Sequence, residues 1–446
     1  MNRPTTVAIA LMLTLAVQGA AQVSDHLTLD EAIRLGRERS RTLKVSAAKV
    51  DAAQAKADEV STALLPAVRA EANYKRASEV DPFQIQFPGA PQPTVISPVV
   101  LNNYNVAVGV SQPIFLGFRL RSNARAAASM AEVARSDYRS SEADLVLGIT
   151  AAYWTLHQTR ETTRLTRQNV ERLTRYVEDV EKLMKAGLAT TNDLLKIQVQ
   201  LSSARLTLID ATIDARLALM NLNNVIGRPL EADVELTSAP GLDRRDAKGL
   251  PEDPLAPAID RAFDARPELE AMHYRIEASK EGVTAAQAGW WPQLALVGSY
   301  LYSRPNPRIF PTRDMFIGTW EVGLRLQWDV WTWMTPAYQT EQAVAMVRQN
   351  ELQLEQMKEN ISLEVHRSAL GLRRAREKVE VAELGVQQAE ENLRSTTEKF
   401  KNGLATSTDL LDADVAALQS RTSLTGALVE FEMARATFVR ATGMLE

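Results

Sequence analysis

An eleven-residue stretch occurs twice in this sequence and constrains what the chain can fold into. Lys185–Leu195 and Lys401–Leu411 agree at eight of eleven positions, and both contain Gly-Leu-Ala-Thr followed by Asp-Leu-Leu. The offset is 403 − 187 = 216 residues, and it also relates positions well outside this stretch, such as Gly227 and Gly443. A duplication of this size fixes the architecture, because each copy must fold as the same supersecondary unit.

The N-terminus has the pattern of a secretory signal. Arg3 supplies a positive charge, residues 7–17 are apolar, and Gly19-Ala20-Ala21 offers small residues for cleavage, so residues 1–21 are predicted to be removed. The apolar run is shorter than the ~20 residues needed to cross a bilayer. The chain has no cysteine, which excludes disulfides and an N-terminal lipid on cysteine. No later stretch resembles a transmembrane helix, so any membrane span must consist of strands.

The first copy is predicted to span residues 22–227. A helical pattern over 29–65 ends at Pro66, and residues 67–77 then alternate between apolar and polar side chains. A Pro-rich loop leads to a second alternating segment at 104–114. The long helix that follows repeats core positions every seven residues, which is typical of coiled coils: Ile149, Leu156, Thr163, Val170, Val177, Met184. The Gly-Leu-Ala-Thr turn at 187–190 and a return helix complete the copy.

A connecting segment at 228–254 joins the two copies. The second copy, residues 255–446, repeats the same order of elements. Strands are predicted at about 293–302 and 320–331, and the second Gly-Leu-Ala-Thr turn falls at 403–406. The heptad register is itself duplicated, because its core positions equal those of the first copy plus 216: Val365, Leu372, Val379, Val386, Leu393, Phe400. The fold class is therefore mainly α with a small β part.

The four alternating segments have about the length of tilted transmembrane strands. Tryptophans at or near the ends of the second pair match the aromatic girdle of outer-membrane strands: Trp290, Trp291, Trp320, Trp328, Trp331, Trp333. An ordinary half-buried sheet with core aromatics is the competing interpretation. Four strands cannot close a barrel, and an open edge in lipid leaves backbone groups unpaired. If these strands lie in a membrane, several chains must share them.

The chain resembles the TolC-like outer-membrane efflux proteins over nearly all of its mature length. The resemblance rests on the two turns in register, the segment Ser111–Gly117 at a strand end, and the duplicated helix-strand-strand-helix-helix order. It implies a homotrimer in which four strands per chain form a twelve-stranded transmembrane β-barrel and the long helices form an α-barrel through the periplasm. It also implies an exit duct in the outer membrane of a Gram-negative bacterium, partnered by a periplasmic adaptor and an inner-membrane transporter.

The resemblance assigns roles to acidic residues near the second turn. The family's selectivity ring maps onto Asp409 and Asp412, which share a helix face and would line the narrowest point of a cation-favouring pore. The alternative is that Asp409 only caps its helix through Thr406 and that Asp412 is solvated. A family gate residue maps onto Asp193, for which a capping role is the alternative.

Two family gate positions differ in this chain. The gate tyrosine falls on Phe400, which cannot donate a hydrogen bond, and the gate arginine falls on Ala405. The resemblance therefore does not predict which contacts close the tip. The turns themselves are predicted to dock the adaptor, with tight-turn packing as the alternative explanation of their composition: Gly187, Leu188, Ala189, Thr190, Gly403, Leu404, Ala405, Thr406.

Two other classes of protein are alternatives to a channel. A periplasmic coiled-coil adaptor or scaffold without a pore would need the alternating segments to form a soluble sheet. An enzyme is disfavoured, because no nucleophile elbow, phosphate loop or metal-ligand cluster occurs and the four histidines lie far apart. No cofactor is expected. The net charge of −4 gives no basic stripe, which disfavours nucleic acid as a partner. The exported substrate and the class of pump are not encoded in these patterns.

Overall fold

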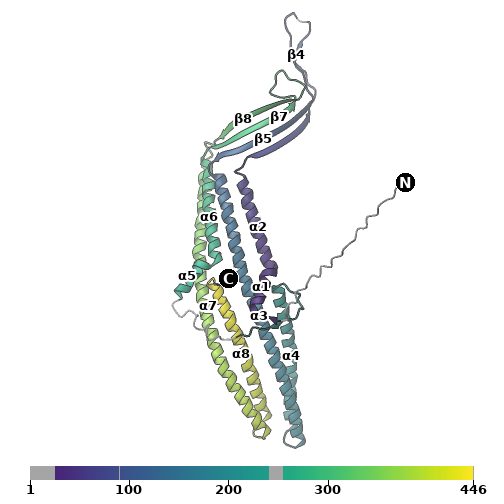
Figure 1. The fold of residues 1–446 in the computed structure, drawn as a ribbon, viewed down its shortest axis with the longest axis vertical. Helices are drawn as coiled ribbons and strands as arrows, with labels where there is room; N and C mark the ends of the chain where they lie inside the picture. Colours follow the sequence, from purple (N-terminus) through teal and green to yellow (C-terminus); the bar gives the residue numbers. More distant parts are fainter. Residues whose placement is uncertain (1–25, 90, 241–254, 445–446) are drawn as a thin grey trace, which may run out of the picture. The chain divides into compact units, whose positions relative to one another are not determined.

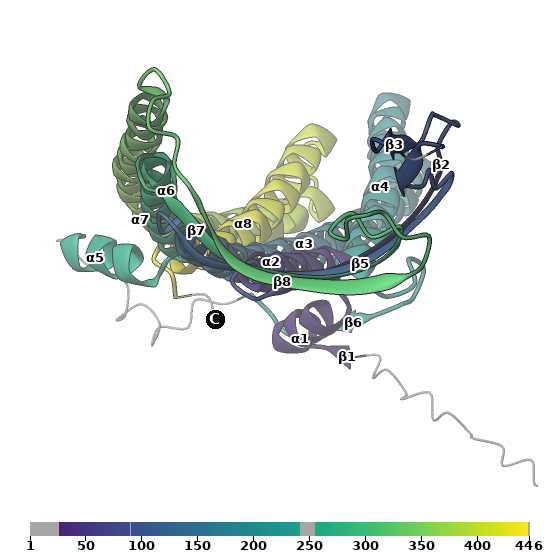
Figure 2. The ribbon, with the colours of Figure 1, turned by 90° about the horizontal axis from the view of Figure 1, so that it is seen from above.

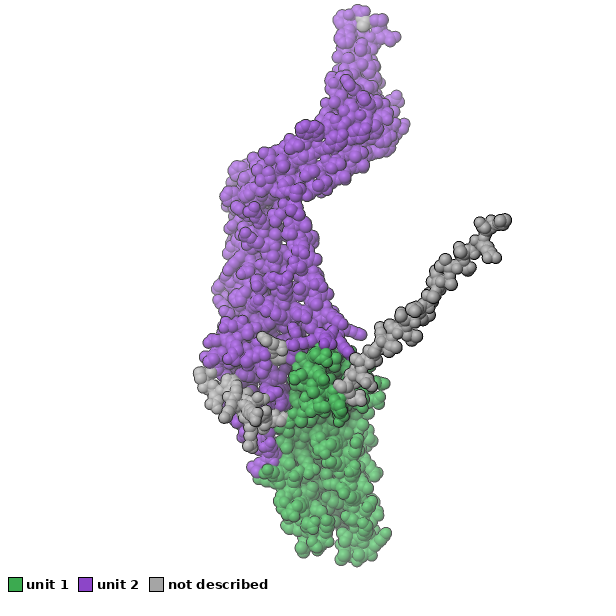
Figure 3. Space-filling view, viewed as in Figure 1, with its two compact units in different colours: residues 1–36, 149–241, 386–429 green, residues 37–148, 242–385, 430–446 purple. Residues whose placement is uncertain are grey.

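The computed structural model describes residues 26–89, 91–240 and 255–444, so the predicted signal at 1–21 lies outside the described residues. The chain forms two compact units, each built from three segments (Figure 3). Unit 1 comprises residues 1–36, 149–241 and 386–429, and unit 2 comprises residues 37–148, 242–385 and 430–446. Both units draw on both copies of the repeat.

The helix bounds reproduce the sequence offset. The long helices α3 (Arg119–Lys185) and α7 (Thr335–Lys401) both have 67 residues, and the return helices α4 (Thr191–Val225) and α8 (Ser407–Ala441) both have 35. Their starts differ by 335 − 119 = 216 and 407 − 191 = 216. All twelve heptad positions named above are buried or half-buried, as coiled-coil packing requires.

Short helices precede the strands in each copy. The helical pattern at 29–65 is divided into α1 (Leu29–Arg39) and α2 (Arg41–Thr62), because the Ser40 side chain accepts a hydrogen bond from Leu43 N and starts a new helix. In the second copy α5 (Ala256–Ala265) and α6 (Pro267–Gln287) are separated at Pro267, and a 3-10 turn, η2 (Ala288–Trp290), follows. No helix among the described residues is long and apolar enough to cross a membrane.

Unit 2 contains an antiparallel sheet with the order β2-β5-β7-β8. Its strands are β2 (Ala67–Arg76), β5 (Asn102–Leu116), β7 (Gln293–Arg304) and β8 (Ile317–Gln327). Figure 2 shows the four strands as one curved sheet, and Figure 1 shows α2, α3, α6 and α7 leaving it at the same end. The strand expected at 320–331 thus begins three residues earlier, and Trp328 and Trp331 follow its end.

Two small strand pairs lie outside the predicted pattern. The Pro-rich loop carries a hairpin of β3 (Phe83–Ile85) and β4 (Thr94–Ser97). In unit 1, β1 (His26–Leu27) pairs in parallel with β6 (Glu235–Leu236). The buried Tyr153 hydroxyl fixes this pair, because it donates to Leu27 O and accepts from Ser238 N, both at 3.0 Å.

The register of the sheet separates apolar from polar side chains. Tyr74 lies opposite Tyr104, Val106 opposite Tyr302, and Tyr300 opposite Trp320, so these residues share one face. We call it the apolar face, and it continues through Val68, Val108, Val110, Leu296, Val322, Leu324 and Leu326. Side chains of this face are between 38% and 73% exposed in the single chain. The opposite face carries Asn105, Ser299 and Glu321 among others.

Aromatic residues border the apolar face at both ends. Tyr74, Tyr104, Tyr300, Tyr302 and Trp320 lie toward the end away from the helices. The other five tryptophans of the predicted girdle lie at the helix end of the strands, and all six girdle tryptophans are between 46% and 80% exposed. From Trp320 to Trp328 the strand rises about 26 Å at ~3.3 Å per residue. This length matches an apolar band of about 25 Å between two girdles.

Gly117 provides a test of the junction between β5 and α3. Its φ of +61° favours glycine, and an added Cβ would lie 2.7 Å from Ala288 O. Gly187 has a φ of +73° but open space around its Cβ position. We expect Gly117→Ala to lower the melting temperature of the detergent-solubilised protein clearly more than Gly187→Ala, whose left-handed strain alone is roughly 1–2 kcal/mol. Equal melting temperatures for the two variants would contradict this packing.

Candidate functional site at the helical turns

The two Gly-Leu-Ala-Thr turns in unit 1 have the same backbone structure. Gly187 and Gly403 adopt φ values of +73° and +71° and end α3 and α7. The next residue closes each turn, since Leu188 N donates to Leu183 O and Leu404 N donates to Lys399 O, both at 2.8 Å. The side chains of Leu188 and Leu404 are left 76% and 77% exposed. Each turn therefore presents one leucine to its surroundings.

Both return helices begin with a capping box. Thr190 Oγ1 accepts from Asp193 N at 3.2 Å, and Asp193 Oδ2 accepts from Thr190 N at 3.0 Å. Thr406 and Asp409 repeat this arrangement at 3.2 and 2.8 Å. The capping geometry that the sequence offered as an alternative is thus present at both aspartates. Asp409 nevertheless remains exposed, and hydrogen bonds from Thr406 hold its pKa below the ordinary value, so it carries a negative charge at neutral pH.

Asp193 also connects the two turns. Its Oδ1 accepts from Ser407 Oγ at 2.6 Å, and Lys196 Nζ donates to Thr408 Oγ1 at 3.2 Å, so the first turns of α4 and α8 are hydrogen-bonded to each other. The hydrogen bonds from Ser407 and Thr190 lower the pKa of Asp193 to about 2. Because the folded pKa is depressed, this contribution to stability is present above the ordinary value near 3.8 and is lost as the pH falls toward about 2.

Asp412 and Phe400 have different surroundings. Asp412 is exposed one turn after Asp409, with no ion pair in the described part of the chain. Phe400 is half-buried in the last turn of α7, and Ala405 is half-buried beside the second turn. The structure therefore places Asp409 and Asp412 at solvent on one helix, and it places Asp193 between the two turns.

A buried acidic residue, Asp414, lies two residues beyond Asp412 on α8 and was not predicted from the sequence. Asp414 is 1% exposed, and its Oδ1 lies 2.7 Å from Arg172 Nε on α3. Asn169, also buried, donates from Nδ2 to Asp414 Oδ2. Burial and the negative charge of Asp414 together raise the pKa of the neighbouring Tyr176. These contacts attach α8 to α3 within unit 1, beside a hydrophobic cluster that includes Leu173, Leu201 and Leu411.

The Asp414 cluster breaks the symmetry of the repeat. Subtracting 216 from Asp414 gives Gln198, while adding 216 to Asn169 and Arg172 gives Gly385 and Gln388. None of these counterparts carries a charge, so the first copy cannot form the same ion pair. A comparison of the two copies, position by position, was the only signal in the sequence that could have indicated it.

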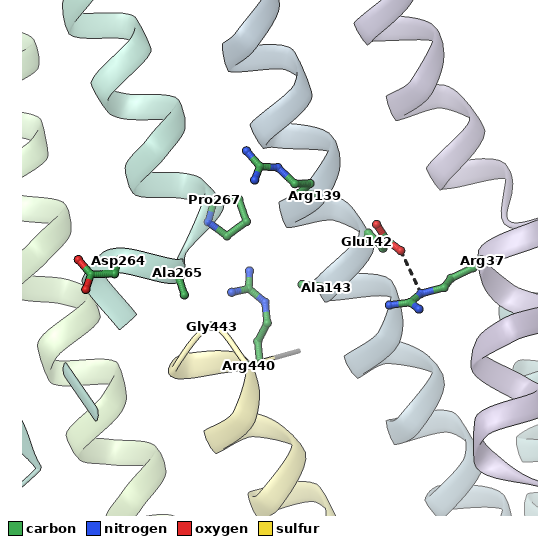
Figure 4. Close-up of a pocket in the computed structure, with 9 residues that line it drawn as sticks. All are labelled: Arg37, Arg139, Glu142, Ala143, Asp264, Ala265, Pro267, Arg440 and Gly443. Carbon is green, nitrogen blue, oxygen red and sulfur yellow. Dashed lines mark ion pairs between the residues drawn. The ribbon is translucent and has the colours of Figure 1, made fainter. Parts of the chain in front are cut away.

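Unit 2 contains a cavity of about 580 Å³ in which three arginines converge, from α1, α3 and α8 (Figure 4). Arg37 Nε lies 3.0 Å from Glu142 Oε1, Arg139 pairs with Glu270, and Arg440 pairs with Asp144 and Glu268. Burial alone raises the pKa of Glu268, but hydrogen bonds from Arg440 and Arg266 outweigh burial and lower it to about 2. All three arginines are neutralised by carboxylates, so the cavity is a junction of ion pairs rather than an anion site.

These features define a class of protein: a duplicated chain of long heptad helices, with a four-stranded sheet whose one face is apolar and with paired polar turns. The sequence profile of the outer membrane efflux protein family matches residues 32–228 and 258–444. The chain therefore belongs to the outer membrane efflux protein family, and it functions as an outer-membrane exit channel of efflux or secretion systems.

Individual relatives agree with this assignment. The chain is 24% identical over 341 residues to the outer membrane efflux protein BepC of Brucella suis biovar 1 (strain 1330), covering 76% of this chain and 72% of BepC. It is 22% identical over 358 residues to the alkaline protease secretion protein AprF of Pseudomonas aeruginosa, covering 77% and 70%. The solved outer-membrane channel OprN has the same fold, with a TM-score of 0.77, 19% identity, and coverage of 93% of this chain and 89% of OprN.

The Asp414 ion pair can be tested by stability measurements. Removing one partner of a buried pair leaves the other charge uncompensated, so we expect Asp414→Ala to destabilise the protein by about 3 kcal/mol. The double variant Asp414→Leu with Arg172→Leu should recover most of that loss, because it removes both charges. Glu390→Ala is the control, since it breaks the more exposed pair with Arg421 and should change stability by about 1 kcal/mol or less. A double variant less stable than Asp414→Ala would contradict the assignment.

Proposed function

We propose that three copies of this chain assemble into one duct, in which their sheets form a closed twelve-stranded transmembrane barrel and their long helices form a hollow α-barrel. The duct passively conducts substrates that an inner-membrane transporter delivers through a periplasmic adaptor to the exterior. Its strands lie in the outer membrane of a Gram-negative bacterium, in contact with outer-membrane lipid, and its helical part lies in the periplasm. Members of the family work as such channels, and this chain shares their family profile and fold.

The observation that carries the proposal is a sheet with an apolar face and two open edges. β2 and β8 are the edge strands, and nearly all of their residues are exposed in the single chain. In lipid, unpaired backbone groups at an edge each cost several kcal/mol, so an open sheet is not stable there. Pairing β8 of one copy with β2 of the next removes every edge, and three copies of four strands make twelve.

A second surface also requires neighbouring copies. Along α4, large apolar side chains are between 53% and 70% exposed in the single chain: Leu195, Val199, Leu206, Ile209, Ile213, Leu217. A stripe of this length exceeds the scattered apolar exposure of ordinary soluble surfaces. Packing against a helix of the next copy around a helical barrel would bury it.

The turns provide the inner end of the duct. Asp409 and Asp412 of three copies would place six carboxylates around the pore, which favours cations. We also assign Asp193 and Phe400 to the gate region, and the hydrogen bond of Asp193 to Ser407 connects the two turns of one chain. Phe400 and Ala405 replace the family's gate tyrosine and arginine. We therefore assign the contacts that keep α8 in place to Ser407, which bonds to Asp193, and to Asp414, which bonds to Arg172. The exposed Leu188 and Leu404 would contact the adaptor.

The proposed duct is tested by reconstitution. Protein purified from outer membranes in detergent should contain three chains by native mass spectrometry and should produce discrete conductance steps in planar lipid bilayers. Extraction by a high-salt wash as a water-soluble monomer without conductance would contradict the proposal and favour a periplasmic scaffold.

The acidic ring generates a separate prediction. We expect the double variant Asp409→Asn with Asp412→Asn to reduce the cation preference of the open channel and to weaken block by divalent cations, because six negative charges per trimer are removed. Asparagine keeps an oxygen for Thr406, so the capping of α8 is largely retained. Asp210→Asn removes an exposed charge from the side of α4 and serves as the control. Reversal potentials in a salt gradient measure the effect, and an unchanged value for the double variant would exclude both residues from the ring.

A further inference from the structure

The junctions between the sheet and the long helices repeat an unusual backbone turn. Gly117 and Phe118 have φ values of +61° and +70°, and Trp333 and Met334 have values of +53° and +62°. These pairs are related by 216 residues, so two consecutive left-handed residues turn the chain from strand to helix in each copy. The backbone of the junction is therefore duplicated, and its side chains can be compared position by position.

At the first junction the turn borders a groove of about 490 Å³. It is lined by large apolar side chains together with the polar side chains of Gln112 and Arg121: Leu64, Gln112, Ile114, Phe115, Phe118, Leu120, Arg121. Ile114 and Phe118 are 53% and 50% exposed, although both are large and apolar. Phe115 packs edge-on against Phe118 and Trp291, with ring centroids 5.3 and 6.3 Å apart. The groove is thus open, carries both large apolar side chains and polar groups, and lies beside Trp291 at the helix end of the sheet.

The register shows which face of the sheet the groove continues. Gln112 lies opposite Leu296, and Phe115 lies opposite Leu294, so both extend the apolar face toward the helices. Gln112 Nε2 donates to Leu64 O at 3.0 Å, which joins the end of α2 to this face. The groove is therefore continuous with the surface that the proposed duct presents to lipid, at the level where the strands end.

Charge distinguishes this groove from its counterpart. Arg121 lines it, and Arg119 lies in the sequence between Phe118 and Leu120, which also line it. Within the described residues neither arginine has an ion pair, and the first turn of α3 carries no acidic residue. In the second copy the positions equivalent to Arg121 and Arg119 are Ala337 and Thr335, and a groove of about 590 Å³ that is lined by Ala337 also contains Glu341. One junction is thus cationic, while the other has no arginine and carries a carboxylate.

We propose that the first junction binds an anionic glycerophospholipid of the inner leaflet of the outer membrane. An acyl chain lies along Ile114 and Phe118, the headgroup phosphate contacts Arg121, and Arg119 adds positive charge at the start of α3. Apolar surface favours any lipid, whereas unpaired arginines at the membrane surface favour a negative headgroup. A free phosphate ion would gain nothing from the apolar lining. The proposal rests on the membrane placement of the strands proposed above, and it predicts one selective site per chain.

Native mass spectrometry of the trimer tests the site. Detergent-solubilised protein is mixed with equal amounts of phosphatidylglycerol and phosphatidylethanolamine that have identical acyl chains. We expect up to three phosphatidylglycerol molecules per trimer to be retained in preference to phosphatidylethanolamine. Arg119→Gln with Arg121→Gln should lower that preference roughly tenfold, while Phe118→Ser should weaken retention of both lipids. Arg125→Gln is the matched control, because Arg125 lies one turn further along α3 and pairs with Glu281 at 3.4 Å, so the preference should not change.

Several results would overturn the inference. They are an unchanged preference in the double arginine variant, six selective sites per trimer, or dissociation of the double variant into single chains. The last result would show that a second copy, and not a lipid, occupies the groove. Failure of the membrane placement is distinguishable, because the wild-type protein would then retain neither lipid and would not require detergent. If the wild-type protein retains both lipids equally, the result contradicts the proposed lipid site but not the membrane placement of the strands.

Discussion

The structure depends on the hydrogen-bonding requirement of a sheet that has one apolar face. Val108, Leu296 and Leu324 lie on that face and are exposed in the single chain, while β2 and β8 keep their outer backbone groups unpaired. Lipid covers the apolar face favourably, but it cannot provide hydrogen-bond partners for the unpaired backbone groups of the edge strands. Pairing the edge strands with those of further copies of the chain would satisfy the backbone groups and leave the apolar face toward lipid. The long helices are connected to this sheet, because α3 begins directly after β5 and α7 begins shortly after β8, and each ends at a Gly-Leu-Ala-Thr turn.

The duplicated backbone carries different chemistry in its two copies. Both long helices end at a left-handed glycine, and both return helices start with a threonine–aspartate capping box. Only the second copy supplies Asp414 for an ion pair with α3, and only Asp193 of the first copy reaches across to Ser407. In the proposed gate, polar contacts therefore connect the tip of the chain at positions other than Phe400 and Ala405, where the resemblance implies a tyrosine and an arginine.

Local patterns predicted most of the fold. Heptad spacing identified both long helices, alternation identified the four long strands, and the Gly-Leu-Ala-Thr turns marked the return helices, because each signal is written in consecutive residues. The mainly helical fold class and the outer-membrane channel function are confirmed by the family match and by the shared fold. The division of the first helix at Ser40 was missed, since a serine inside an Ala-rich pattern gives little warning of an N-cap.

Features that depend on distant partners could not be predicted in this way. The parallel pair of β1 and β6 joins residues about 209 positions apart, and Asp414 meets Arg172 across 242 positions. The start of β8 at Ile317 is set by pairing with Ser303 rather than by its own alternation, which Gly318 interrupts. Among the site residues, the sequence placed Asp409 and Asp412 on one helix face, but it could not show that Asp193 bonds to the opposite turn. The pore and gate roles of these residues remain predictions.

The exposed leucines at the turns have a consequence for molecular recognition. Near Leu188, the aspartate at the start of the return helix is Asp193, which accepts a hydrogen bond from Ser407. Near Leu404, the start of the return helix carries two exposed carboxylates, Asp409 and Asp412. In the proposed trimer these turns would alternate around the threefold axis, so a partner approaching the tips would meet six protrusions of similar shape but of two electrostatic kinds. A partner surface with sixfold rotational symmetry could match the shape of the six turns but not their two kinds of charge. Recognition of charge would require it to adopt two alternating arrangements, which reduces the symmetry of the contact to that of the duct.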